Sequence, residues 1–142
     1  MPYVEFSRIE MPEKRPLLPE GPYKAQVEDI EGRKTREGDE LWRVTFRVVG
    51  GGMPEGRWNG RRLFDNWVFS QRALPRIKLI ASAFGMEVGR NQEITPVDFL
   101  GRSVEVEVRT RRAGPGADDT EENFIPFRSY RRPEGESRNE RR

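Results

Sequence analysis

The sequence predicts a mainly β protein, a five-stranded antiparallel barrel with one helix between the third and fourth strands. Three observations predict this class. Several short segments alternate apolar and polar residues at period two, one segment follows a helical period, and clusters of glycine and polar residues separate them. We expect one domain at residues 22–131, with an extended arm at 1–21 before it and a disordered polar tail at 132–142 after it.

The N-terminal arm is predicted from its prolines. Four prolines interrupt residues 1–21, and each removes a backbone donor and disfavours helix, so we expect an extended or disordered segment. Its apolar side chains remain free to pack on the barrel or on another copy of the chain. These side chains are Tyr3, Val4, Phe6 and Ile9.

The first two strands are predicted at residues 22–30 and 41–49. In both segments the apolar side chains fall on one face and the polar side chains on the other, which is typical of half-buried strands. The entirely polar stretch between them, residues 31–40, carries two glycines and is predicted to be a mobile loop or a hairpin.

The second strand contributes large aromatic side chains to the predicted core. Trp42 and Phe46 alternate with arginines and are therefore expected to point inward. Residues 50–60 follow with five glycines and are predicted to be a long flexible connection. Trp58 lies in this connection without an obvious core partner, so we expect it to be exposed.

The third strand and the helix are predicted within residues 60–85. Apolar residues on both sides of the strand indicate that it is covered on both faces near its end. Ser70 is the candidate N-cap, and a proline at 75 indicates that the helix begins after Ala73. Gly85 is predicted to end the helix in the left-handed conformation. The orientation of Trp67, toward the core or toward solvent, is left open.

Two further strands are predicted after the helix, at residues 101–110 and 124–130. The first alternates valines with polar residues, and Pro126 makes the second an edge strand or a bulged strand. In the loop before them, four apolar side chains are expected to pack on the barrel end. They are Ile94, Val97, Phe99 and Leu100.

The order strand–strand–strand–helix–strand–strand is that of an oligonucleotide/oligosaccharide-binding (OB) barrel. In that fold the ligand face lies on the second and third strands and their flanking loops. The predicted order therefore makes the basic and aromatic side chains within residues 41–69 the candidates for ligand binding.

Composition excludes several classes of function. The chain has no Cys and no His, which removes disulfides, zinc-finger spacings and catalysis by thiol or imidazole. No nucleophile–base pair is evident, so we expect neither an enzyme nor a cofactor. An acidic stretch at residues 118–122 lacks the spaced oxygen ligands of a calcium loop, and Gly50-Gly51-Gly52 is not followed by the Lys and Ser/Thr of a phosphate-binding loop.

Charge and hydropathy give two further expectations. No run of 18 apolar residues occurs, so we expect no membrane partner and a cytoplasmic location. The net charge is only +2, but Lys supplies only four of the 26 basic side chains and Arg the rest. Arginine forms forked hydrogen bonds to phosphate and stacks on planar rings. Genomic composition or a thermophilic source is the alternative reason for this bias.

Four phrases resemble a family of small phage- and prophage-encoded proteins that are usually described as single-stranded-DNA-binding proteins. Residues 18–27, LPEGPYKAQV, are similar to the opening phrase of that family, and residues 40–49, ELWRVTFRVV, to its second strand. Residues 60–70, GRRLFDNWVFS, and 100–108, LGRSVEVEV, resemble two later segments in the same order. The resemblance implies an OB-like fold, a role in phage replication or recombination, and the host cytoplasm as location.

A basic and aromatic surface is the main functional signal in the residues. Residues 57–78 hold six basic side chains against Asp65 alone. A cationic groove with aromatic stacking faces is what sequence-independent single-strand binding requires. We therefore predict a DNA-binding surface that combines these residues with two neighbouring loops: Arg33, Lys34, Arg36, Arg43, Arg47, Trp58, Arg61, Arg62, Trp67, Arg109, Arg111, Arg112 and Tyr130.

Alternatives accompany this prediction. Arg43 and Arg47 are also explained as a solvated strand face paired with Glu105 and Glu107. The near-neutral net charge and the aromatic arm also suit an adaptor that recruits a phage recombinase, helicase or polymerase and binds DNA weakly or not at all. Self-association of the chain is left open by the sequence.

Overall fold

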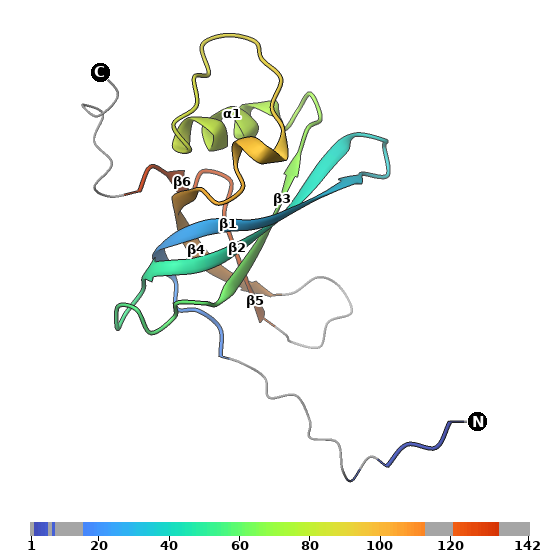
Figure 1. Cartoon of the computed structure of the whole chain (residues 1–142), viewed down its shortest axis with the longest axis vertical. Coiled ribbons are helices and arrows are strands. Elements are labelled where there is room, and N and C mark those ends of the chain that lie inside the picture. The colour runs from blue at the N-terminus through green and yellow to red at the C-terminus, as the bar shows by residue number, and fades with distance from the viewer. Residues whose placement is uncertain (1, 6, 8–15, 113–120, 134–142) are drawn as a thin grey trace.

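The structure, a computed structural model, describes residues 2–5, 7, 16–112 and 121–133 (Figure 1). In chain order the elements are β1 (Gly21–Lys34), β2 (Glu40–Gly51), β3 (Arg62–Val68), α1 (Leu74–Ala83), the 3-10 helix η2 (Pro96–Asp98), β4 (Ser103–Arg112), β5 (Glu121–Phe124) and β6 (Tyr130–Arg131). The predicted mainly β class with one helix between the third and fourth strands is confirmed.

The strands form an antiparallel sheet in the order β3-β2-β1-β4-β5, and β6 pairs with β4. The central strand β1 pairs with β2 along nearly its whole length and with β4 only over residues 21–26. Val27 lies opposite Phe46, and Ala25 lies opposite Val104, so the apolar side chains of neighbouring strands lie on the same face of the sheet. The period-two patterns of the sequence are thus the inward faces of β1, β2 and β4.

The prediction of a closed five-stranded barrel is only partly right. Within the described residues β3 and β5 occupy the two ends of the strand order and do not pair with each other, so hydrogen bonds do not close the sheet. The expected last strand at 124–130 is two strands, β5 and β6, separated by a turn. The turn contains Pro126, which has no N–H for a strand ladder, and its carbonyl accepts a hydrogen bond from the Ser129 N–H at 3.2 Å.

The core lies between the curved sheet and α1. Trp42 and Phe46 are buried, as predicted, and Trp67 and Phe99 pack edge-on with ring centroids 5.0 Å apart. The helix covers one end of the sheet (Figure 1) and buries Ile77 and Ile80 in the core.

The ends of α1 follow the prediction at one terminus and differ at the other. The helix begins after Ala73 as expected, but Ala73 itself is the N-cap, and Ser70 accepts the Ala73 N–H in the preceding turn at 3.2 Å. Gly85 has φ +82°, a conformation that favours glycine, and its N–H bonds to the Ser82 carbonyl at 2.9 Å. The Met86 N–H reaches back to the Ala81 carbonyl at 3.0 Å, which completes the cap.

The connections are more regular than predicted. The strand pairing of β1 and β2 extends into residues 31–34 and 40, so the hairpin turn occupies only residues 35–39. Residues 52–60 form consecutive turns joined by backbone hydrogen bonds. Before β4, Phe99 is buried and Ile94 packs on the core, but Val97 and Leu100 are exposed.

The end of the arm that precedes β1 packs on the sheet. Leu18 is buried, whereas Tyr3 is 87% exposed and Val4 is also exposed. Phe6, Ile9 and residues 134–142 of the expected tail lie outside the described residues. Across the described parts of the chain, we find no helix with the length and apolar character needed to cross a membrane.

Candidate nucleic-acid interface

A groove of about 600 Å³ lies along the unpaired boundary between β3 and β5. We call it the seam groove. Basic, amide, acidic and aromatic side chains of β2, β3, β4 and β5 line it, together with the aliphatic Leu17 of the arm. Its lining residues are Leu17, Arg43, Arg62, Leu63, Phe64, Asp65, Asn66, Arg111, Glu121, Glu122, Asn123, Phe124 and Ile125.

Residues 16–18 of the arm border one end of the seam groove. The Arg61 guanidinium donates to the Pro16 carbonyl at 2.7 Å on the β3 side. On the β5 side, the Asn123 amide accepts from the Leu18 N–H at 2.9 Å and donates to the Leu18 carbonyl at 3.0 Å. The arm therefore bridges the two edges where strand pairing is missing.

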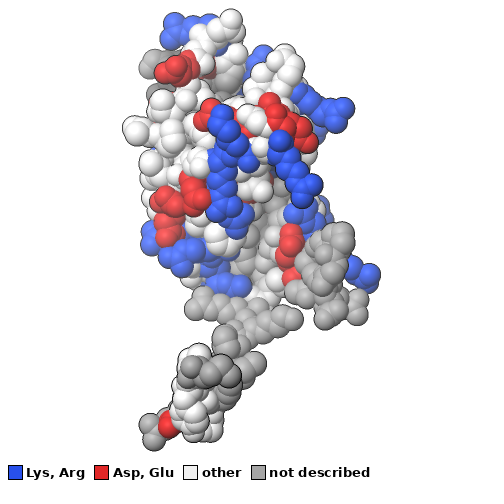
Figure 2. Space-filling model, turned by 90° about the vertical axis from the view of Figure 1, so that its right-hand side faces the viewer, with Lys and Arg blue, Asp and Glu red and all other residues white. Residues whose placement is uncertain are grey.

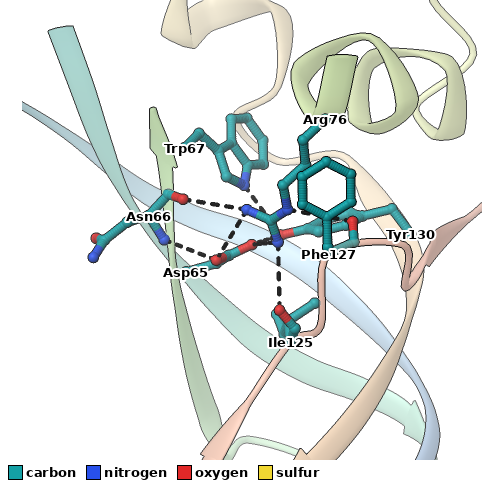
Figure 3. Close-up of polar contacts among 7 residues, drawn as sticks. All are labelled: Asp65, Asn66, Trp67, Arg76, Ile125, Phe127 and Tyr130. Carbon is teal, nitrogen blue, oxygen red and sulfur yellow. Dashed lines mark hydrogen bonds and ion pairs between the residues drawn. The ribbon is translucent and has the colours of Figure 1, made fainter. Parts of the chain in front are cut away.

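The other end is closed by the guanidinium of Arg76, which projects from α1 (Figure 3). Arg76 Nη2 lies 2.7 Å from Asp65 Oδ2, and both side chains are only 12% exposed. The same guanidinium donates to the backbone carbonyls of Asn66, Ile125 and Phe127 at 3.3 to 3.4 Å. A single side chain thus joins the helix, β3 and the turn after β5.

Trp67 and Tyr130 complete this network from the inside. The Trp67 indole donates to the Tyr130 hydroxyl at 3.1 Å, and that hydroxyl donates to Asp65 Oδ2 at 2.6 Å (Figure 3). Trp67 is 1% exposed and Tyr130 is 8% exposed. Burial first, and then the Asp65 carboxylate, raise the pKa of Tyr130 well above its usual value.

The prediction that Trp67 and Tyr130 serve as stacking faces is therefore wrong. Leu63, Asp65 and Trp67 occupy alternate positions of β3 and share its inward face, so the indole joins the core. Tyr130 points inward because its hydroxyl is held by Asp65, whose carboxylate also lies on that face. Neither ring presents a face to a ligand.

Three phenylalanines, which the sequence interpretation did not select, lie along the boundary instead, each beside an arginine. The Arg43 guanidinium lies 4.8 Å from the ring centroid of Phe64, and that of Arg111 lies 4.5 Å from the centroid of Phe124. The guanidinium of Arg76, which also pairs with Asp65, lies 5.7 Å from the ring centroid of Phe127. Phe64 is 47% exposed and Phe127 is 49% exposed. Phe64 lies between Leu63 and Asp65, which point inward, so alternation along β3 places its ring on the outward face. This alternation is the sequence signal that identifies Phe64.

The arginines of the seam groove differ in their partners. Arg43 lies over Phe64 and has no carboxylate partner among the described ion pairs. Arg62 pairs with Glu28 at 2.9 Å, and Arg111 pairs with Glu122 at 3.0 Å.

The other predicted basic residues lie outside the groove lining. Arg47 donates to the amide of Gln26 at 3.2 Å, and Arg109 lies 3.9 Å from Glu20 and 3.7 Å from Glu107. The end of the β1–β2 hairpin carries Arg33, Lys34 and the turn residue Arg36, all exposed, and Arg112 is exposed at the end of β4. The hydrogen bond from Arg33 lowers the pKa of Glu31.

The surface is consequently mixed in charge. On the face shown in Figure 2, Lys and Arg side chains form separate streaks with Asp and Glu beside them. The alternative that pairs Arg43 and Arg47 with Glu105 and Glu107 is wrong, because β1 lies between β2 and β4. Glu105 and Glu107 instead pair with Arg131.

Trp58 is half-buried and packs against the edge of the core, so the expectation of an exposed indole without a core partner is only partly right. Arg57 and Arg61 lie over its ring. In the described part of the chain, no group of three or more acidic residues has the spacing of a metal site. Asp118 and Asp119 of the acidic stretch lie outside the described residues.

No protein-family model matches the chain, and no curated protein matches it either.

Proposed function

We propose that this chain binds single-stranded DNA with little sequence preference, through the seam groove of an OB-like open barrel. The observation that carries the proposal is the pair of Arg-over-Phe stacks, Arg43 with Phe64 and Arg111 with Phe124, on opposite edges of one groove. A role in phage replication or recombination rests on the resemblance of the four sequence phrases to phage-encoded proteins.

The strand order supports the OB-like assignment. An OB fold is a five-stranded, partly open Greek-key barrel, and its remaining opening lies between the strands at the ends of the order. Here those strands are β3 and β5, and the seam groove lies between them. This differs from the surface predicted by the sequence, which was centred on the outer faces of β2 and β3.

The chemistry of the groove suits a strand with unpaired bases. Bases stack on aromatic and guanidinium planes without regard to sequence, and each stacked base typically contributes about 1–3 kcal/mol. Phe64 and Phe124 supply the rings, and the guanidiniums of Arg43, Arg62 and Arg111 supply charge for the backbone. A duplex hides its base faces, so it has no such stacking available.

The ion pairs in the groove do not prevent phosphate binding. The Arg62–Glu28 and Arg111–Glu122 pairs are both exposed to solvent. Exposed pairs of this kind contribute only about 0.2–1 kcal/mol, so a phosphate is able to compete for the guanidinium. The acidic partners then lower the overall affinity, and binding is strongest at low salt.

The test is fluorescence anisotropy of a labelled oligo-dT at two salt concentrations, with Arg43→Glu as the variant. We expect binding at low salt, and we expect the charge reversal to weaken it for every sequence tested. Lys78→Glu is the matched control, because Lys78 is exposed on α1 and does not line the groove. Absence of binding at low salt, or equal losses in both variants, contradicts the proposal.

A protein–protein adaptor is the second candidate. It is favoured by the mixed charge of the seam groove, where two of the three arginines have carboxylate partners, and by the exposed ring of Phe64. The partner would be a phage recombinase, helicase or polymerase. A pull-down from infected cells in the presence of nuclease separates the two functions, because a contact mediated only by DNA is lost under that treatment.

A further inference from the structure

The turn-rich loop between β2 and β3 holds two guanidiniums against one indole. The Arg57 guanidinium lies 5.3 Å from the ring of Trp58, and the Arg61 guanidinium lies 5.7 Å from it. Neither arginine takes part in an ion pair among those of the described residues. We call Arg57, Trp58 and Arg61 the loop cluster.

The loop cluster is held in place by its own backbone. The Arg57 N–H bonds to the Pro54 carbonyl at 3.1 Å, and the Arg61 N–H bonds to the Trp58 carbonyl at 3.2 Å. The Trp58 indole donates to the Met53 carbonyl at 3.3 Å. These bonds fix the indole and both arginine backbones before any ligand arrives.

Gly52 shows how closely the loop packs behind the indole. A Cβ at this position would lie 2.8 Å from Trp58 Cδ1 and 2.7 Å from the Tyr23 ring, closer than side chains tolerate. The φ of Gly52 is +77°, which also favours glycine. The indole is therefore backed by the barrel and turns its remaining exposed surface outward with the two arginines.

The loop cluster lies directly beside the seam groove along the chain. Arg61 is followed by Arg62, which lines the groove, and the Arg61 guanidinium holds Pro16, whose neighbour Leu17 also lines it. A strand that leaves this end of the groove passes Arg61 first. Both guanidiniums lie within 5.7 Å of the same ring centroid, and an anion bound near them offsets their like charge.

We propose that the loop cluster is a phosphate subsite for the single strand as it leaves the seam groove. Arg57 and Arg61 bind a backbone phosphodiester, and the indole of Trp58 contacts the adjoining nucleotide. The inference rests on the proposed function, since the strand must first occupy the groove. It predicts that the full binding site requires a longer oligonucleotide than the groove alone.

The intrinsic fluorescence of Trp58 is a label-free measure of binding at this subsite. Trp42 and Trp67 are both buried in the core, so among the three tryptophans only Trp58 has a surface that a ligand can contact. A short strand in the seam groove is therefore expected to bind without quenching tryptophan fluorescence. A longer strand is expected to bind and to quench it.

The experiment compares an end-labelled series of oligo-dT lengths by anisotropy and, in parallel, by tryptophan fluorescence. In Arg57→Gln we expect weaker binding of long oligomers, a salt slope lowered by about one, and no change for the shortest oligomer that binds. Arg90→Gln, an exposed arginine in the loop after α1, is the matched control. Thermal melting verifies that each variant is folded.

The outcomes separate the subsite from the proposed function. If every length binds but none quenches, and Arg57→Gln equals the control, the subsite is overturned and the groove still binds DNA. If no length binds, both proposals are overturned. If inorganic phosphate at equal phosphate concentration produces the same quenching as a long oligomer, the loop cluster is a site for free anions and the strand path is overturned.

Discussion

The Tyr130 hydroxyl donates a 2.6 Å hydrogen bond to Asp65 Oδ2, and this bond joins β6 to β3 across the boundary that strand pairing leaves open. Asp65 connects the two partners, because Arg76 of α1 bonds to the same carboxylate oxygen as Tyr130 does. Side chains therefore connect β3 to α1 and β6 at this point, and the seam groove lies beside them. The shape of the candidate site therefore depends on the largely buried Asp65–Arg76 ion pair.

Removing the Tyr130 hydroxyl tests this closure. In Tyr130→Phe the buried Trp67 indole loses its acceptor and Asp65 loses a donor, and an unsatisfied buried group costs about 1–3 kcal/mol. We expect the free energy of unfolding, measured in urea, to fall by that amount. Tyr3→Phe is the matched control, because Tyr3 is exposed. Equal stabilities of the two variants would show that the hydroxyl contributes nothing.

Replacing Arg76 tests the ion pair. Arg76→Met leaves Asp65 as a largely buried carboxylate without its cation, and breaking such a pair typically costs about 3–5 kcal/mol. Arg76→Lys retains the charge but loses the fork that reaches three carbonyls, so we expect an intermediate loss. Arg72→Met, on an exposed arginine, is the control in the same denaturation series. A loss for Arg76→Met no larger than for the control contradicts the role of Arg76.

Alkaline pH provides a further test of Tyr130. Burial and the Asp65 carboxylate raise the pKa of this tyrosine in the folded state above its unfolded value of 10.0. The unfolded chain therefore releases the proton first, so the stabilisation is complete below pH 10.0 and is lost as pH rises through the folded pKa. We expect stability to decline more steeply above pH 10.0 in the native chain than in Tyr130→Phe. Parallel curves for the two proteins would exclude this coupling.

Much of the fold was predictable because its strands carry local patterns. The alternation around Trp42 and Phe46 predicts β2 and its inward face, and a proline two residues into α1 predicts where the helix starts. The break between β5 and β6 is not predicted, because the local sequence of residues 124–130, FIPFRSY, indicates a single strand. Pro126 indicated an irregularity, but not that the chain turns and pairs with β4 again.

The candidate site was less predictable because it depends on distant contacts. The orientation of Trp67 is set by Tyr130, 63 residues later, and no local pattern contains that contact. In β3, apolar residues lie on both sides of the strand, so the sequence predicts that both faces are covered and does not assign Phe64 to the surface. The seam groove arises only when β3 and β5, the two ends of the strand order, come together.

Removing a ring of the seam groove tests stacking directly. Phe64 is 47% exposed, so Phe64→Ala is expected to cost little stability while removing one stacking face. The affinity for oligo-dT should fall by about 1–3 kcal/mol, roughly five- to 150-fold, when measured by anisotropy. Val97→Ala removes an exposed apolar side chain elsewhere and should leave the affinity unchanged.

The combination with Arg43 shows whether ring and guanidinium act together. Because Arg43 lies over Phe64, the double variant Arg43→Gln with Phe64→Ala should lose less affinity than the two single losses added together. Strict additivity would mean that the bound strand uses the charge and the ring at separate places. Unchanged affinity in Phe64→Ala would remove base stacking in the seam groove and favour the adaptor function, in which the exposed ring contacts protein.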